Sequence, residues 1–228
     1  GPYGLVSGAA GVGKIFLVRA MWRAQQGNSR LIVLPCGSFF KDYYVAGSRR
    51  RIGGGREAVD QLTPYLVESS GGLLVLHHVE QLPTALQEEL DARLAAATEN
   101  DDATLRLAGI DSKGPVDYDL RLVATSTYSP ETLLSSGRMI PDLVARLSER
   151  HVRIPALAER GSQDLFLLCD DILRRIAARR KLQPEPRIDL EAVHLLSRKV
   201  WPGNISDLVR VLERAVRRAE GRATIGVE

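Results

Sequence analysis

The chain has few cysteines and no long hydrophobic run, and each absence excludes a broad class of protein. Only Cys36 and Cys169 occur in the 228 residues, which is too few for a disulfide framework and fits a reducing cytoplasm. No apolar run is long enough to cross a membrane, and no signal peptide opens the chain. We therefore expect a cytoplasmic protein without membrane partners.

Charge of one sign is not in large excess either. Lys and Arg total 31 and Asp and Glu total 28, and a net charge of +3 permits acidic partners without requiring them. The sequence lacks internal repeats and low-complexity segments. Hydrophobic residues make up 44% of the chain, enough for the packed core of one large domain, or of one domain plus a smaller one.

A glycine-rich loop stands between a short apolar run and a helical run near the amino terminus. Its residues are Gly8, Ala9, Ala10, Gly11, Val12, Gly13 and Lys14. Between a strand and a helix, such a loop directs backbone N–H groups and a helix N-terminus at phosphate oxygens, and Lys14 adds a charge for the outer phosphates. Ile15 follows where most such loops carry Ser or Thr to hold magnesium, so the residues that bind a nucleotide would be Gly8 to Ile15.

Short apolar runs alternate with helical patterns over the first two thirds of the chain. We predict strands at 5–7, 31–34, 73–76, 120–124 and 152–155, a hairpin over 105–116, and helices at 15–24, 38–44, 57–68, 83–97, 131–135 and 141–147. The run 31–34 is continuously apolar, which predicts a strand buried on both faces. Strands that alternate with helices predict a parallel sheet covered on both faces, a three-layer α/β fold.

The remainder of the chain after Pro155 is helical in pattern, with three amphipathic segments. The third begins after Trp201-Pro202-Gly203, and we expect Asn204 to cap it, with Asp207 three residues on as in a capping box. The predicted domains are therefore an α/β core over residues 1–155 and a helical lid over residues 156–228. Between the second and third strands, residues 47–56 are basic and rich in glycine. A solvated surface loop is favoured there over a contact with nucleic acid phosphates.

Several motifs, taken together, resemble the AAA+ module of bacterial enhancer-binding proteins, the transcription activators that work with sigma-54. There are six such motifs: the loop at 8–14; Gly71-Gly72 together with the strand after it and residues 82–87; residues 121–125; residues 142–143 together with 146–147; residues 157–160; and Trp201 to Asn204. The resemblance implies a P-loop AAA+ core with a helical lid that binds ATP or ADP. It also implies a homo-oligomer, contact with RNA polymerase, and DNA binding through a helix-turn-helix domain outside this chain.

The resemblance also shows where the chain departs from the family. There the third strand is followed by an Asp that holds magnesium and a Glu that polarises the attacking water, but here these positions are His77 and His78. Neutral imidazole is a poor ligand for magnesium. Adjacent residues on a strand point to opposite faces, so we do not expect the two histidines to share a metal ion, and we expect no metal site.

Other positions that the family uses have changed as well. The sensor Asn is Thr127, the lid Arg is Ser206, and of the two arginines that act on a neighbour's nucleotide only Arg146 remains, since the other position is Ile140. Arg146 fits a finger role and a surface ion pair equally well. The Gly-Ala-Phe-Thr-Gly-Ala loop that engages sigma-54 has no counterpart, because residues 47–55 contain no Phe-Thr pair.

The residues leave three functions open and favour the first. It is a regulatory AAA+ domain that binds ATP or ADP, with or without magnesium, and does not hydrolyse it. The second is a working ATPase with rearranged catalytic residues, and the third is an oligomerisation module with an empty site. A cyclic dinucleotide is a further alternative ligand, since Arg19, Asp171 and Arg175 lie at suitable places, although Asp171 and Arg175 are better explained as a helix-surface ion pair.

Overall fold

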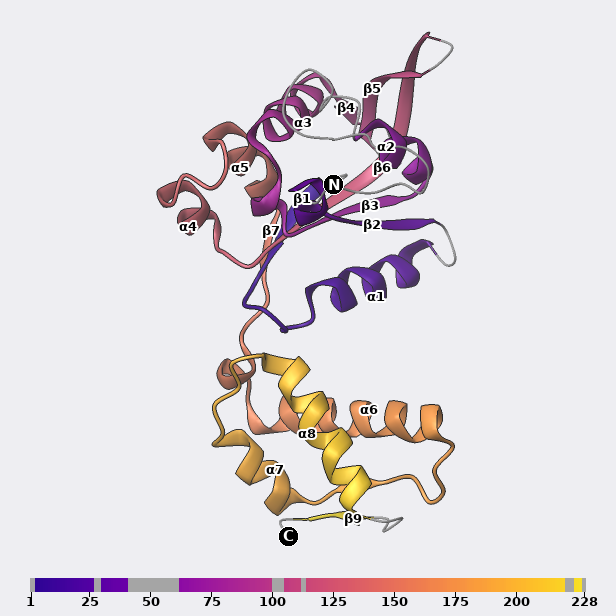
Figure 1. The fold of residues 1–228 in the computed structure, drawn as a ribbon, viewed down its shortest axis with the longest axis vertical. Helices are drawn as coiled ribbons and strands as arrows, with labels where there is room; N and C mark the ends of the chain where they lie inside the picture. Colours follow the sequence, from indigo (N-terminus) through magenta and orange to yellow (C-terminus); the bar gives the residue numbers. More distant parts are fainter. Residues whose placement is uncertain are drawn as a thin grey trace. The chain divides into compact units, whose positions relative to one another are not determined.

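A computed structural model of the chain describes residues 3–26, 30–40, 62–99, 105–111, 114–219 and 224–226. It consists of two compact units (Figure 1). The first, which we call the core unit, combines Gly1–Gly8 with Lys14–Arg153. The second, the lid unit, combines Ala9–Gly13 with Ile154–Glu228. The cationic segment at 47–56 and the first part of the helix expected at 57–68 lie outside the described residues.

The core unit is built on a sheet whose five principal strands run in the order β2-β3-β6-β1-β7. These strands are β1 (Tyr3–Ser7), β2 (Leu31–Pro35), β3 (Leu73–His77), β6 (Gly114–Ser126) and β7 (His151–Arg153). All four pairings between them are parallel, as the alternating pattern predicted. The predicted hairpin is also present, with β5 (Leu105–Asp111) antiparallel to the first half of β6 and the short β4 (Thr98–Glu99) beside it.

The register of this sheet brings the carboxyl ends of three strands to one edge. Ser7 at the end of β1 is opposite Ser126 at the end of β6, and His77 at the end of β3 is opposite Thr125. In open parallel sheets, ligands bind outside the carboxyl ends of the strands. The residues that follow Ser7, His77 and Ser126 therefore surround the place where a ligand is expected.

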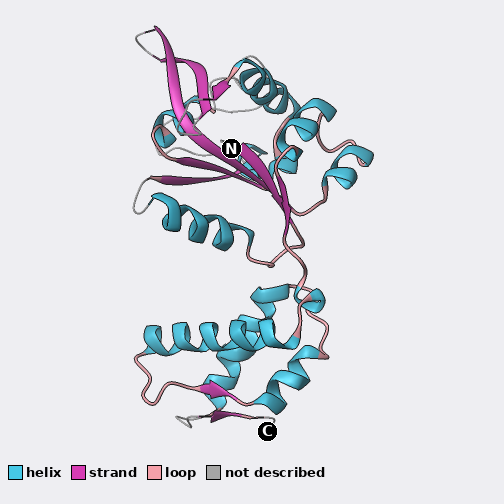
Figure 2. Cartoon of the chain, turned by 180° about the vertical axis from the view of Figure 1, so that it is seen from behind, coloured by secondary structure: helices cyan, strands magenta, loops and turns pink. Residues whose placement is uncertain are grey.

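Helices cover both faces of the sheet, which confirms the three-layer α/β fold. Helix α1 (Lys14–Gln26) lies on one face, and α3 (Thr84–Ala96) and α5 (Pro141–Ser148) lie on the other (Figures 1 and 2). The remaining helical elements in the described part of the core unit are α2 (Thr63–Ser69), α4 (Pro130–Ser135) and the 3-10 turns η1 (Cys36–Phe40) and η3 (Val79–Gln81). The leucines at 86, 90 and 94 are all buried against the sheet, as their spacing of four predicted.

Two expectations about the second strand and the segment after it are wrong in detail. Three of the five residues of β2 are only partly buried, because among the strands that the structure describes β2 lies at the edge of the sheet and pairs only with β3. The helix expected at 38–44 is instead the 3-10 turn η1, which starts two residues earlier, at Cys36. Residues 41–44 lie outside the part of the chain that the structure describes.

The lid unit has a hydrophobic core of its own and contains the three predicted helices. These are α6 (Ser162–Arg180), α7 (Leu190–Ser197) and α8 (Asn204–Arg218), preceded by the 3-10 turn η4 (Leu157–Glu159). Trp201, Cys169, Leu208 and Leu212 are buried between them. The sequence did not predict the small parallel sheet of β8 (Arg187–Ile188) and β9 (Thr224–Ile225), whose two-residue strands are too short to give a periodic pattern.

The start of α8 differs from the expected capping box. Asn204 has a left-handed backbone, with φ +51°, and its side chain makes no capping hydrogen bond to α8. Asp207 does reach back, but its carboxylate accepts a hydrogen bond from the backbone N–H of Gly203 at 2.7 Å. The Asn204 side chain is thereby left to bind other parts of the lid unit, including the phosphate loop.

Candidate functional site: the phosphate loop and the strand ends

The two ends of the glycine-rich loop are fixed to the core unit by hydrogen bonds. The backbone N–H of Gly8 donates to Ser126 O at 3.2 Å, and Lys14 Nζ donates to Gly8 O at 2.6 Å. Lys14 is the first residue of α1 and is only 5% exposed. Burial lowers the pKa of the Lys14 ammonium, and the negative charge of Glu80 partly offsets this effect. A buried lysine at a helix N-terminus is the arrangement that phosphate binding requires.

The middle of the loop belongs to the lid unit and is held there by two hydrogen bonds. Asn204 Nδ2 donates to Ala10 O at 2.8 Å, and the backbone N–H of Ile205 donates to Gly11 O at 3.0 Å. Each planar trans peptide directs its N–H opposite to its C=O. Binding of the Ala10 and Gly11 carbonyls therefore turns the N–H groups of Gly11 and Val12 away from the lid contacts, where they are available to phosphate oxygens.

Gly11 is required by both its backbone and its surroundings. Its φ of +75° lies in the left-handed region, and a Cβ built there would be 2.1 Å from Gly203 O. Any side chain at position 11 would displace the loop from the lid residues that hold it. The glycine spacing in the sequence thus reflects a real steric limit at this position.

The two histidines at the end of β3 lie side by side, so the expectation that they point to opposite faces is wrong. His77 is the last residue of the strand, but His78 has a left-handed backbone, with φ +59°, and its ring turns back. The ring centroids are 4.1 Å apart. His77 Nδ1 is 2.8 Å from Thr125 Oγ1, and His78 Nδ1 is 3.1 Å from Thr127 Oγ1. A left-handed backbone at a non-glycine residue is uncommon and concentrates at functional sites.

Glu80 is the residue of this site that the sequence analysis missed. It lies in η3, and its side chain is 4% exposed. Glu80 Oε1 accepts the backbone N–H of Thr127 at 3.1 Å and is 3.3 Å from His78 Nδ1. Burial by itself would raise the pKa of Glu80. The hydrogen bonds from Thr127 and His78, together with one from the backbone N–H of Glu80 and one from the Ser126 side chain, lower the pKa below its usual value. Glu80 is therefore an ionised, buried carboxylate.

The residues at the strand ends do not fit a magnesium site. Burial, together with the charges of His78 and Lys14, lowers the pKa of His77 to about 4, so His77 is a neutral imidazole near pH 7. Magnesium prefers oxygen ligands, and the side chain of Ile15 has none. Glu80 has oxygens, but Oε1 already accepts the backbone N–H of Thr127 at 3.1 Å, and Oε2 is buried. In the described part of the chain, no three His, Cys, Asp or Glu side chains form a group that could hold a metal ion.

Three of the other predicted site residues form ion pairs. Arg146 Nε donates to Asp91 Oδ1 at 3.0 Å, which matches the surface ion pair that was one of its two interpretations. Asp171 and Arg175 form an exposed ion pair at 2.8 Å on α6, whereas Arg19 is exposed on α1 in the core unit. Ser206 lies in the first turn of α8, in the lid unit.

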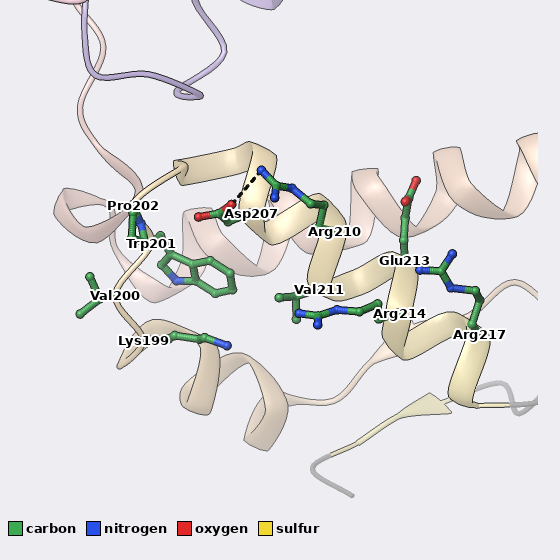
Figure 3. Close-up of a pocket in the computed structure, with 10 residues that line it drawn as sticks. All are labelled: Lys199, Val200, Trp201, Pro202, Asp207, Arg210, Val211, Glu213, Arg214 and Arg217. Atoms are coloured by element: carbon green, nitrogen blue, oxygen red, sulfur yellow. Dashed lines mark ion pairs between the residues drawn. The ribbon is translucent and has the colours of Figure 1, made fainter.

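The lid unit also contains a cavity of about 420 Å³ between the segment 199–202 and α8 (Figure 3). Its charged lining residues are Lys199, Arg210, Arg214, Arg217, Asp207 and Glu213. Both acids already have a partner, since Asp207 pairs with Arg210 at 3.2 Å and Glu213 pairs with Arg179. The cavity is cationic, but it lacks the glycine-rich backbone of a phosphate loop. The loop and the strand ends therefore remain the candidate nucleotide site.

Comparison with known proteins identifies the family. A model of the sigma-54 interaction domain matches residues 3–153, and a model of the AAA+ ATPase lid domain matches residues 159–228. The chain belongs to the sigma-54 interaction domain family. This confirms the resemblance and agrees with the observed α/β core followed by a helical lid.

Similar curated proteins are transcriptional regulators. The transcriptional regulatory protein GlrR of Escherichia coli is 29% identical over 217 residues, covering 93% of this chain and 46% of that protein. The regulatory protein AtoC of the same species is 27% identical and is covered to 44%. The putative transcriptional regulatory protein y4pA of Sinorhizobium fredii is 32% identical and is covered to 33%. The chain thus spans less than half the length of these relatives.

Solved structures confirm the fold. The structure of NtrX from Brucella abortus in complex with ATP has a TM-score of 0.69 and 22% sequence identity, covering 96% of this chain and 48% of NtrX. The complex of NtrX with ADP has a TM-score of 0.68 and 23% identity, covering 96% of this chain and 47% of NtrX.

None of the helices that the structure describes is long and apolar enough to span a membrane.

Proposed function

We propose that this domain binds ADP or ATP as a regulatory ligand of a bacterial transcription regulator and does not hydrolyse it. The proposal rests on two features that lie together at one edge of the sheet. A phosphate loop that keeps its glycines and a buried Lys14 adjoins strand ends that present two imidazoles and a buried Glu80. The nucleotide acts as a signal if it binds two conformations of the domain with different affinity.

Binding is supported by the loop itself. Gly11 has the backbone that the loop needs, the loop carbonyls are held on the side away from the N–H groups, and Lys14 is desolvated. Desolvation strengthens the attraction between an ammonium and a phosphate. The structurally similar NtrX has been solved with ATP and with ADP.

Lack of turnover is supported by the strand ends. Phosphoryl transfer depends on a metal ion that neutralises the developing charge and on a group that orients the attacking water. The positions that would hold magnesium and polarise water are His77 and His78, and His77 has a pKa of about 4. A nucleotide bound here would have Lys14 as its main counter-charge.

The wider role rests on the family. We infer that the domain forms a homo-oligomer and belongs to a longer regulator that binds DNA through a separate helix-turn-helix domain and acts on RNA polymerase. Because residues 47–55 contain no Phe-Thr pair, we infer that it does not engage sigma-54 as typical members do.

The test compares binding with turnover in the same preparation. Equilibrium binding of labelled ADP and ATP should be saturable and should weaken at least tenfold in Lys14→Ala, the size expected for loss of one charge-assisted contact. Phosphate release with magnesium should not differ between the two proteins. Release that requires both magnesium and Lys14 would refute the proposal, as would the absence of binding at millimolar nucleotide.

A working ATPase is a second candidate, and one observation favours it. Glu80 and Thr127 both lie within hydrogen-bond distance of His78 Nδ1, at 3.3 and 3.1 Å. A carboxylate that orients an imidazole prepares its other nitrogen to accept a proton. Under this alternative, His78→Gln would abolish phosphate release and leave nucleotide affinity unchanged.

A further inference from the structure

Glu80 is linked to the start of the phosphate loop through hydrogen bonds to two consecutive residues at the end of β6. Its Oε1 accepts the N–H of Thr127 at 3.1 Å, and the preceding residue, Ser126, accepts the N–H of Gly8 at 3.2 Å. Gly8 O in turn accepts Lys14 Nζ at 2.6 Å. The carboxylate therefore lies at the same sheet edge as the lysine that serves the outer phosphates.

Glu80 already engages two polar groups at this edge. Its carboxylate takes the backbone N–H of Thr127, and His78 Nδ1 is shared between Glu80 Oε1 and Thr127 Oγ1. These groups follow the ends of β3 and β6, the sheet edge where the phosphates of a bound nucleotide are expected. A third phosphate at this edge would meet a fixed negative charge.

The burial of Glu80 makes this charge effective. Its side chain is 4% exposed, and Oε2 is buried with no hydrogen-bond partner. Water therefore screens the charge poorly. A magnesium ion would ordinarily offset the extra charge of a third phosphate, but His77 and His78 supply no oxygen ligand. A diphosphate carries one phosphate fewer and would avoid the conflict.

We propose that Glu80 acts as an internal anion in the place of a third phosphate and makes this site selective for nucleoside diphosphates over triphosphates. This inference rests on the proposed function, since it concerns which nucleotide the phosphate loop binds. Glu80 is a specificity residue, and the domain would respond to the concentration of ADP more than to that of ATP.

The test measures the ratio of ADP affinity to ATP affinity by titration calorimetry in EDTA. The 228-residue chain should bind ADP about tenfold more tightly than ATP, the size of one poorly screened charge interaction. Glu80→Gln, which keeps an oxygen to accept the Thr127 N–H, should reduce the ratio below about threefold. Glu80→Asp, which keeps the charge, should leave it above threefold. Glu88→Gln, an exposed change on α3, should leave the ratio unchanged.

The outcomes separate this inference from the function on which it rests. Because the measured quantity is a ratio within one preparation, partial unfolding of a variant does not alter it. Equal affinity for ADP and ATP in the unmodified chain, or an unchanged ratio in Glu80→Gln, would overturn the selectivity while leaving nucleotide binding intact. ATP binding that magnesium strengthens and Glu80→Gln abolishes would instead assign Glu80 as a metal ligand and overturn the proposal. No binding of either nucleotide would overturn the proposed function itself.

Discussion

Asn204 offers a sharp test of how the lid unit holds the phosphate loop. Its Nδ2 donates to Ala10 O at 2.8 Å, and its Oδ1 accepts the backbone N–H of Leu157 at 2.8 Å. Asn204→Ala removes both bonds and forces alanine into a left-handed backbone. The Leu157 N–H is left buried without a partner, which costs about 1–3 kcal/mol, whereas Ala10 is exposed and its carbonyl can bind water. The left-handed conformation costs alanine about 1 kcal/mol. We therefore expect the lid unit to lose about 2–4 kcal/mol of unfolding free energy.

The two tryptophans allow each unit to be followed separately. Trp22 is buried in the core unit and Trp201 in the lid unit. In a Trp22→Phe background, urea unfolding followed by tryptophan fluorescence reports the lid unit alone.

A matched variant divides the loss into its parts. Asn204→Gly loses the same hydrogen bonds but accepts the left-handed backbone, so it should be about 1 kcal/mol more stable than Asn204→Ala. A loss below about 1 kcal/mol in Asn204→Ala would refute the argument, because it would mean that neither hydrogen bond is needed. Equal stability of the two variants would refute the backbone contribution.

Three further predictions concern single contacts. Because burial lowers the pKa of His77 to about 4 from 6.5, protonation below pH 6.5 favours the unfolded chain. The unfolding free energy should fall from pH 6.5 to 4 by at most roughly 3 kcal/mol. A pH series on His77→Gln should be flatter, and an identical slope would contradict this. Gly11→Ala should cost much more stability in thermal melts than Gly137→Ala, which has φ +62° but open space around it; equal costs would refute the clash. In a double-mutant cycle, Arg146 and Asp91 should couple by about 0.5–1 kcal/mol, with nucleotide affinity unchanged; altered affinity would contradict a purely structural pair.

The architecture of the core could be predicted because its signals are repeated along the chain. Apolar runs such as 73–76 alternate with helices, and that order fixes a parallel sheet whose strand ends converge. The leucine spacing in α3 fixed its buried face. The phosphate loop followed from its position between a strand and a helix, and Lys14 lies where the motif required.

The parts that could not be predicted depend on backbone turns and distant partners. Glu80 reaches Thr127 only because His78 turns the chain through a left-handed conformation, which no residue pattern at 77–80 indicates. The same turn brings the two imidazoles together. Asn204 resembles a helix cap in sequence, but its side chain binds Ala10 from 194 positions away. The one available signal was a glutamate three residues beyond a strand end that lacks the carboxylates of the family.

The most direct test of the central claim is the affinity for ADP with and without magnesium. The claim is that the phosphate loop binds nucleotide through its backbone and Lys14, without a metal. Labelled ADP should therefore bind saturably in EDTA, with a dissociation constant that magnesium changes by less than about threefold and Lys14→Ala weakens at least tenfold. Binding that appears only when magnesium is present, or that survives Lys14→Ala unchanged, would contradict the account.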